Sequence, residues 1–95
     1  MSDFSFQLFV AGDTPRSHLA ASNLRDLLDR VAPDDYDLEV IDVLERPDLA
    51  EKERILATPF VLKISPPPTR RVVGDLTDLA LAARALDLHQ REVSS

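Results

Sequence analysis

The side chains that most often carry out chemistry in proteins are few in this chain and poorly spaced for it. The sequence contains two histidines, His18 and His89, and no cysteine. No Asp or Glu stands at metal-ligand spacing that would join the two histidines, so we interpret both as surface or boundary residues. Without cysteine, the chain can form no disulfide, no thiolate metal site and no dithiol redox centre.

The remaining candidates for chemistry are hydroxyls, glycines and carboxylates. Three hydroxyl side chains lack a histidine nearby in sequence that could activate them as nucleophiles: Thr14, Thr58 and Ser65. Gly12 lies outside any G-x-G-x-x-G or P-loop spacing. The cluster Asp34, Asp35 and Asp37 lacks the spacing and terminal Glu of a calcium loop and is typical of a solvated turn. We therefore predict a protein that is not an enzyme and that holds no cofactor or metal.

Composition and charge limit the classes of partner. The 95 residues predict a single domain over 1–95, with 44% hydrophobic and 29% charged residues. A net charge of -6 disfavours sequence-independent binding to nucleic acid or to an anionic membrane. No apolar run approaches the roughly 20 residues of a membrane span, and acidic Asp3 replaces the basic start of a signal peptide. We expect a cytoplasmic protein whose partners are other proteins.

The first half of the sequence predicts a strand, a helix and a second strand. Residues 4–10 alternate in the period of a strand that is buried on one face. Thr14 and Pro15 are suited to the N-cap and first position of a helix. The apolar face of that helix consists of Ala20, Leu24, Leu27, Leu28 and Val31. Residues 38–44 have the apolar character of a second, parallel strand.

The second half predicts shorter elements. A short helix over 47–56 precedes a third strand over 60–64. Pro66, Pro67 and Pro68 cannot donate backbone hydrogen bonds, so they form a connector or a sheet edge. Residues 69–73 follow as a strand antiparallel to the third, residues 74–75 as a turn, and the last helix starts at 76–78.

This order, with Thr58-Pro59 entering the third strand, has the layout of a thioredoxin-like βαβαββα sandwich, an α/β fold. Since the chain has no cysteine, it cannot perform the redox chemistry of that fold. The sequence therefore predicts a scaffold that serves binding.

Several blocks of sequence, in order, resemble the KaiB family of circadian clock proteins. They cover most of the chain from residue 4 to about residue 88, and the ordered set is specific although each block alone is weak. The blocks are residues 8–15, 40–44, 47–51, 55–59, 66–68, 70–71 and 73–76. The same domain also occurs at the N-terminus of a sensor histidine kinase.

The resemblance implies a partner and a change of fold. Members of the family bind KaiC, a RecA-like ATPase, and through it sequester KaiA, and they have no catalytic activity. They also rearrange their C-terminal half between a tetrameric ground state and a monomeric thioredoxin-like state. The residues that we assign to this switch are Pro59, Pro66, Pro67, Pro68, Gly74 and Asp75. We expect the thioredoxin-like monomer here; the alternative is the ground-state homotetramer, and the prolines could instead be ordinary sheet-edge residues.

Departures from the family pattern bear on the partner. Clock-type members carry Lys in a Tyr-x-Leu-Lys-Val pattern, where this chain has Glu39 three residues after Tyr36. The reversed charge lies on an edge implicated in holding KaiA, which argues against KaiA sequestration. A basic position of the first helix is occupied by Leu19, whereas the basic residue before Ile-Leu-Ala-Thr-Pro is kept as Arg54. The predicted partner-binding residues are Arg54, Glu39 and Tyr36.

The sequence thus predicts a non-enzymatic adaptor that binds a KaiC-like ATPase and regulates its timing. A module of stress response or signalling, which recognises a histidine kinase or another protein without KaiC, is the alternative.

Overall fold

The structure is a computed structural model that describes residues 3–88, and its elements follow the predicted order. They are β1 (Phe4–Val10), α1 (Pro15–Val31), β2 (Tyr36–Asp42), α2 (Pro47–Lys52), β3 (Phe60–Ser65), β4 (Arg70–Val73) and α3 (Leu79–Ala85). Within the described range, no helix has both the length and the apolar character needed to cross a membrane.

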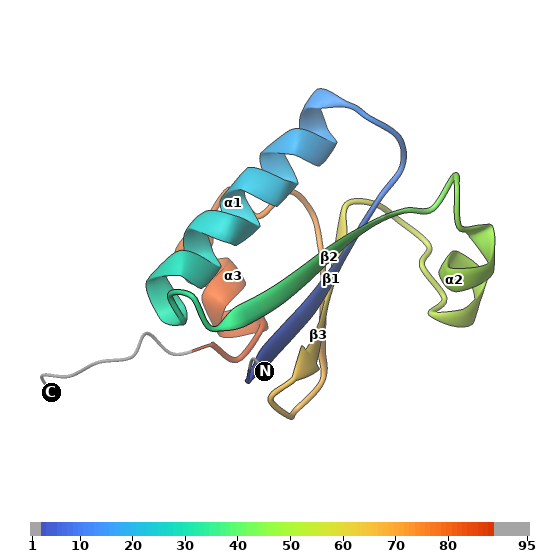
Figure 1. Cartoon of the computed structure of the whole chain (residues 1–95). Coiled ribbons are helices and arrows are strands. Elements are labelled where there is room, and N and C mark those ends of the chain that lie inside the picture. Colours follow the sequence, from blue (N-terminus) through green and yellow to red (C-terminus); the bar gives the residue numbers. More distant parts are fainter. Residues whose placement is uncertain (1–2, 89–95) are drawn as a thin grey trace, which may run out of the picture.

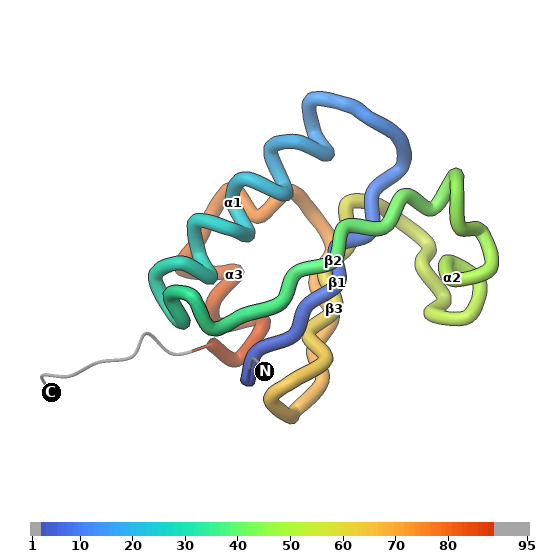
Figure 2. The backbone as a smooth tube through the Cα atoms, in the orientation of Figure 1, coloured from blue at the N-terminus to red at the C-terminus, as the bar shows by residue number. Residues whose placement is uncertain are grey.

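The strands form one sheet in the order β2-β1-β3-β4. As predicted, β1 pairs in parallel with β2, and β4 pairs antiparallel with β3. The antiparallel pairing of β1 with β3 joins the two halves of the chain. Helices α1 and α3 lie on the same side of the sheet, whereas α2 lies beyond the end of β2 and away from both (Figure 1). Figure 2 shows the tight reversal of the chain between β3 and β4.

The larger core lies between the sheet and the two helices α1 and α3. The predicted apolar face of α1 is confirmed, because its five members are all buried. Across from it lie Phe6, Leu8 and Val10 of β1, and α3 adds Ala82. Helix α1 begins as predicted, with Thr14 as N-cap accepting a hydrogen bond from the Ser17 N–H at 3.1 Å.

The opposite face of the sheet carries a small second core. It consists of Phe9, Ile41, Phe60 and Leu62, with Val43, Leu49 and Ile55 packed against it. The rings of Phe9 and Phe60 meet edge to face, with centroids 6.2 Å apart. Only α2 and its flanking loops cover this face, so most of it is open.

Strand β2 differs from the prediction in both position and burial. It spans Tyr36–Asp42, two residues earlier than predicted, and only Ile41 of the strand is buried. The apolar sequence predicted a parallel strand, which β2 is, but the strand lies at the edge of the sheet with one neighbour. The polarity of the side chains along a strand indicates which faces can be buried, but it does not indicate where the strand lies in the order of the sheet.

Two predicted helices are shorter in the structure. Helix α2 ends at Lys52 and not at Leu56, because Arg54 has a left-handed φ of 57° that terminates it. Helix α3 starts at Leu79, since buried Leu76 has a φ of 64° and the Asp78 side chain caps the helix.

Candidate protein-interaction surfaces

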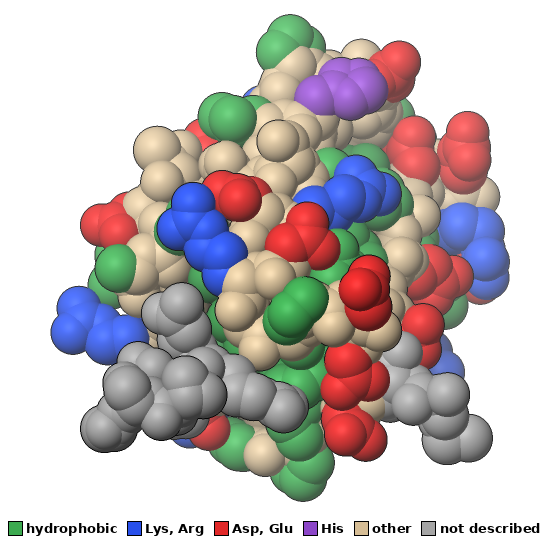
Figure 3. All heavy atoms as spheres, turned by 60° about the vertical axis from the view of Figure 1, so that its left-hand side comes forward, with side chains coloured by type: hydrophobic (Ala, Val, Ile, Leu, Met, Phe, Trp, Pro, Cys, Tyr) green, Lys and Arg blue, Asp and Glu red, His purple; other side chains and the backbone are tan. Residues whose placement is uncertain are grey.

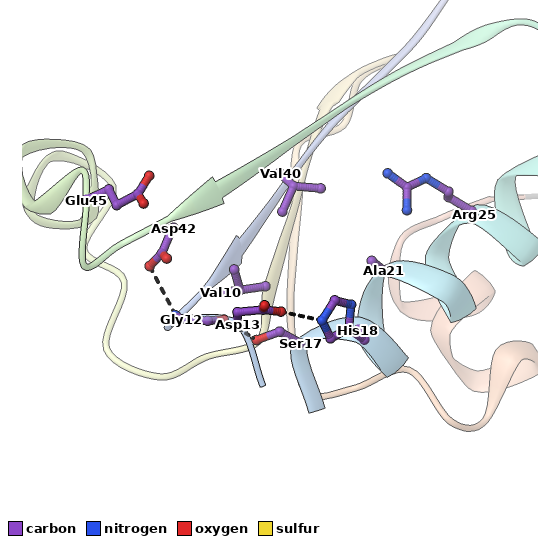
Figure 4. A pocket seen from close by; sticks show the side chains of 10 residues that line it. All are labelled: Val10, Gly12, Asp13, Ser17, His18, Ala21, Arg25, Val40, Asp42 and Glu45. Atoms are coloured by element: carbon purple, nitrogen blue, oxygen red, sulfur yellow. Dashed lines mark hydrogen bonds and ion pairs between the residues drawn. The ribbon is translucent and has the colours of Figure 1, made fainter. Parts of the chain in front are cut away.

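A cleft lies between the start of α1 and the end of β2. Figure 4 shows Asp13 and His18 pointing toward each other at one end, and the structure records a contact between these side chains. Asp42 Oδ1 accepts hydrogen bonds from the N–H groups of Gly12, at 3.1 Å, and Leu44, at 2.9 Å. The carboxylate of Asp42 therefore serves to fix two loops together.

The cleft offers little for catalysis or metal binding. Among residues 3–88, no group of three His, Asp or Glu side chains is arranged to hold a metal ion. His18 is exposed, and its contact is with one carboxylate. His89 lies outside the described residues.

The end of the molecule at α2 presents apolar side chains to solvent. Leu56 is 94% exposed and Leu44 is 71% exposed. Leu56 lines a shallow groove together with Val43, Pro47, Arg54 and Ile55, whereas the Leu44 side chain lies toward Gly12. Exposed apolar side chains around a groove that also contains an arginine are typical of a protein-binding surface. Sequence reasoning had not singled out either leucine, because it placed Leu44 in a strand and Leu56 in a helix.

Arg54, a predicted partner-binding residue, lies at this surface in an unusual backbone conformation. The Ile55 N–H donates to Ala50 O at 2.8 Å, and the Arg54 N–H donates to Glu51 O at 3.1 Å. This is the Schellman pattern that ends a helix, and its left-handed position is usually a glycine. An arginine with a φ of 57° is held there at a cost of about 1 kcal/mol relative to glycine. Such strain at an exposed charged residue is a hint of function.

The other two predicted partner-binding residues lie on β2, on opposite faces of the sheet. Tyr36 faces α1 and donates its hydroxyl to Asp29 Oδ1 at 2.8 Å. Partial burial, and then the Asp29 carboxylate, raises the pKa of Tyr36. Glu39 is exposed on the open face, where it accepts a hydrogen bond from Gln7 Nε2 at 3.2 Å. The structure therefore does not join Tyr36, Glu39 and Arg54 into one patch.

Among the residues assigned to the switch of fold, the structure brings Pro59 and Gly74 together. Gly74 has a φ of 127° and donates its N–H to the carbonyl of buried Pro59 at 2.8 Å. Asp75 then binds to α1, since its carbonyl accepts from Asn23 Nδ2 at 2.8 Å and its carboxylate lies 3.8 Å from Arg16 Nε. A hydrogen bond from Thr77 lowers the pKa of Asp75.

The three consecutive prolines lie apart from this contact. Pro66, Pro67 and Pro68 connect β3 to β4 at the far end of the hairpin, as the sequence predicted. The peptide bonds before Pro59, Pro66 and Pro68 are cis.

Lys63 is a feature that the sequence did not reveal. It occupies a position on β3 with an exposed fraction of only 1%, on the side of the sheet that α3 covers. Burial lowers its pKa, the nearby Asp87 carboxylate acts in the opposite direction, and Arg70 adds to the lowering. A lysine within an apolar strand is the only signal that could have indicated a buried charge.

The surface charge is unevenly distributed. Figure 3 shows acidic side chains gathered along one side of the face in view, with Lys and Arg side chains more scattered. At the sheet edges the contrast is sharper, because β2 carries Asp37, Glu39 and Asp42 while β4 carries Arg70 and Arg71. The two edges would therefore attract partners of opposite charge.

Comparisons with known proteins agree with this architecture. A family model described as the KaiB domain matches residues 7–88. The circadian clock oscillator protein KaiB of Prochlorococcus marinus strain MIT 9303 is 48% identical over 91 residues, which cover 96% of this chain and 76% of that protein. The protein of the same name from Synechococcus sp. strain RCC307 is 47% identical over 91 residues, with 96% and 83% covered.

Solved structures match the fold. The N-terminal domain of SasA from Synechococcus elongatus superposes with a TM-score of 0.73 at 29% identity, covering 88% of this chain and 80% of that one. Mitochondrial thioredoxin 3 of Saccharomyces cerevisiae gives a TM-score of 0.70 at 22% identity, with 93% and 81% covered. The thioredoxin-like fold predicted from the sequence is thereby confirmed.

Proposed function

This chain belongs to the KaiB family, and from that membership we propose that it is a non-enzymatic, cytoplasmic adaptor that binds a KaiC-like ATPase. The curated relatives are named as circadian clock oscillator proteins, so the regulated process is a timing cycle. The thioredoxin-like state is the form that binds, as a monomer. The predicted switch from a tetrameric ground state, through Pro59, Pro66, Pro67, Pro68, Gly74 and Asp75, is part of this proposal.

The observation that carries the proposal is the surface at the end of α2. Leu56 lies 94% exposed there and lines the same groove as Arg54, whose conformation is strained. A few residues at the centre of a protein interface supply most of its affinity, and arginine is enriched among them. We assign Arg54 and Leu56 as the central contacts with the ATPase.

The edge of β2 is a second, weaker candidate surface. Tyr36 and Glu39 lie there on opposite faces, with three carboxylates along the strand. An acidic edge suits a basic partner, so we propose that KaiA, whose binding in the family uses a lysine at this position, is not bound here.

Binding is tested by titrating the fluorescently labelled protein with a purified KaiC-type ATPase. We expect Arg54→Glu and Leu56→Ala each to weaken binding at least about tenfold, as central interface residues do. Arg30→Glu, an exposed position on α1, serves as the matched control and should bind normally. Unchanged affinity in both α2 variants would remove this surface from the interface.

Arg54→Gly separates stability from binding. Glycine relieves the left-handed strain, so the free energy of unfolding should rise by about 1 kcal/mol while binding weakens. An Arg54→Gly variant that is neither more stable nor weaker in binding would show that the conformation has no functional meaning.

The alternative is a module of stress response or signalling that recognises a histidine kinase or another protein without KaiC. Affinity capture from the native cell separates the two. Recovery of a RecA-like ATPase supports the adaptor, and recovery of a kinase without the ATPase supports the alternative.

A further inference from the structure

The edge strand β4 presents free backbone groups in a defined pattern. Gly74 donates its N–H across to Pro59 O at the end of the β3–β4 ladder. Because hydrogen-bonded pairs alternate along an antiparallel ladder, Val72 also bonds toward β3, whereas the backbone groups of Arg71 and Val73 point away from the sheet. No other strand of the described chain pairs with this edge.

Apolar side chains border the same edge on both faces of the sheet. Val73 is 58% exposed on the open face. On the other face a shallow groove runs between β4 and α3, lined by Val72, Leu76, Leu81, Ala82 and Ala85. Leu81 at its rim is 57% exposed. A strand added to this edge would cover apolar side chains above and below it. In such pairing the main-chain hydrogen bonds supply affinity, and the side-chain contacts supply specificity.

The first two residues of β4 are positively charged arginines. Arg71 is engaged within the molecule, because it donates to Glu53 O at 2.7 Å and lies over the Phe60 ring at 5.7 Å. Arg70 is exposed, close enough to the buried Lys63 ammonium to repel it, and makes no recorded ion pair within residues 3–88. Along one short strand, two basic residues therefore precede two apolar ones, in a protein whose net charge is -6.

We propose that β4 is a docking edge for an extended acidic peptide from a partner protein. The peptide would add a strand beyond β4, pairing with the outward groups of Arg71 and Val73. Two neighbouring apolar residues of the peptide would lie beside Val72 and Val73, and two acidic residues would lie beside Arg70 and Arg71. The β2 edge, which carries carboxylates in place of arginines, would repel the same peptide. This edge adjoins the surface at α2, because Arg71 donates to Glu53, the residue before Arg54.

The test uses a synthetic fluorescein-labelled peptide with two threonines, two valines, two glutamates and a threonine in that order. Anisotropy measures its affinity, and amide NMR locates its site on the full chain. We expect shift changes at residues 70–74 and 81–85, and slower hydrogen exchange at the Arg71 and Val73 amides. A peptide with lysines in place of the glutamates should bind at least about tenfold more weakly.

Two variants separate charge from backbone pairing. Arg70→Glu should weaken binding of the glutamate peptide and strengthen binding of the lysine peptide. A folding defect would weaken both and so could not produce this exchange of preference. Val73→Pro removes the outward N–H while leaving the ladder to β3 intact, and it should weaken both peptides at least about tenfold. Arg30→Glu, on exposed α1, should change neither affinity.

Three results would overturn the proposal. One is equal binding of the glutamate and lysine peptides, or no binding of either at about 1 mM, the weak limit of specific recognition. Another is a set of shift changes at residues 36–42 in place of 70–74. The third is a concentration-dependent dimer of the free chain that Val73→Pro abolishes, which would make a second copy the occupant of this edge.

Discussion

The two faces of the sheet differ in how they are covered, and the difference separates stability from recognition. On one face, α1 and α3 enclose a continuous core that includes Leu28 at 0% exposure. On the other, a few residues such as Ile41 and Phe60 form a small cluster beneath α2, a helix with no buried residue of its own. The face covered by α1 and α3 supplies most of the stability of the fold. The opposite face, near α2, leaves side chains accessible to a partner.

The largest expected effect comes from the covered face. Leu28→Ala removes a fully buried side chain between α1 and the sheet, so we expect the free energy of unfolding to fall by about 2–5 kcal/mol. Urea denaturation with linear extrapolation measures it. The matched control is Leu56→Ala at the α2 end, where 94% exposure predicts a change within about 0.5 kcal/mol. Equal losses in the two variants would contradict the division between the faces.

A smaller effect is expected on the opposite face. Ile41→Val removes one methylene from the second core, and the free energy of unfolding should fall by about 0.5–1.5 kcal/mol. The same urea measurement applies. If the loss were negligible, the second core would be too loosely packed to stabilise the protein, and the contrast between the faces would be sharper still.

The third prediction concerns how the free energy of unfolding changes with pH. Burial lowers the pKa of Lys63 below its ordinary value of 10.5, so the unfolded chain binds more protons between the two values. Lys63 therefore destabilises the fold at neutral pH, and this cost disappears as the pH rises toward 10.5. The raised pKa of Tyr36 has the opposite effect above its ordinary value of 10.0, because the unfolded chain loses that proton first.

Comparing Lys63→Met with the parent chain separates the pH dependence that comes from Lys63 from the one that comes from Tyr36. Urea midpoints measured from about pH 8 upward should show the variant as the more stable at the lower pH, with the difference shrinking as pH rises. A difference that stays constant with pH would mean that Lys63 keeps its ordinary pKa in the folded protein.

Local patterns account for what could be predicted about the fold. The alternation in β1, the five-residue apolar face of α1 and the Thr14 cap depend on neighbours in sequence, and each is found as predicted. The predicted end of α2 and the predicted start of α3 were wrong, because they depend on the left-handed residues Arg54 and Leu76. Neither residue is a glycine, which would have indicated such a conformation from the sequence.

The candidate site likewise has one part that the sequence could predict and another that it could not. Arg54 could be chosen from the sequence because a motif surrounds it, but the exposure of Leu56 in the same groove depends on where α2 and its loops lie. The motif that contains Tyr36 and Glu39 placed both among the partner-binding residues, and the alternation of the strand puts them on opposite faces.

By itself the sequence determined the class of fold, the absence of thiol chemistry and the membership of a family, because composition, periodicity and ordered motifs are properties of the chain alone. Only the tertiary structure decided that β2 and β4 are the edges, that one edge is acidic and the other basic, and that Lys63 is buried. These depend on which strands pair across long stretches of sequence, and the free energy of such pairing comes from burial that no local pattern records.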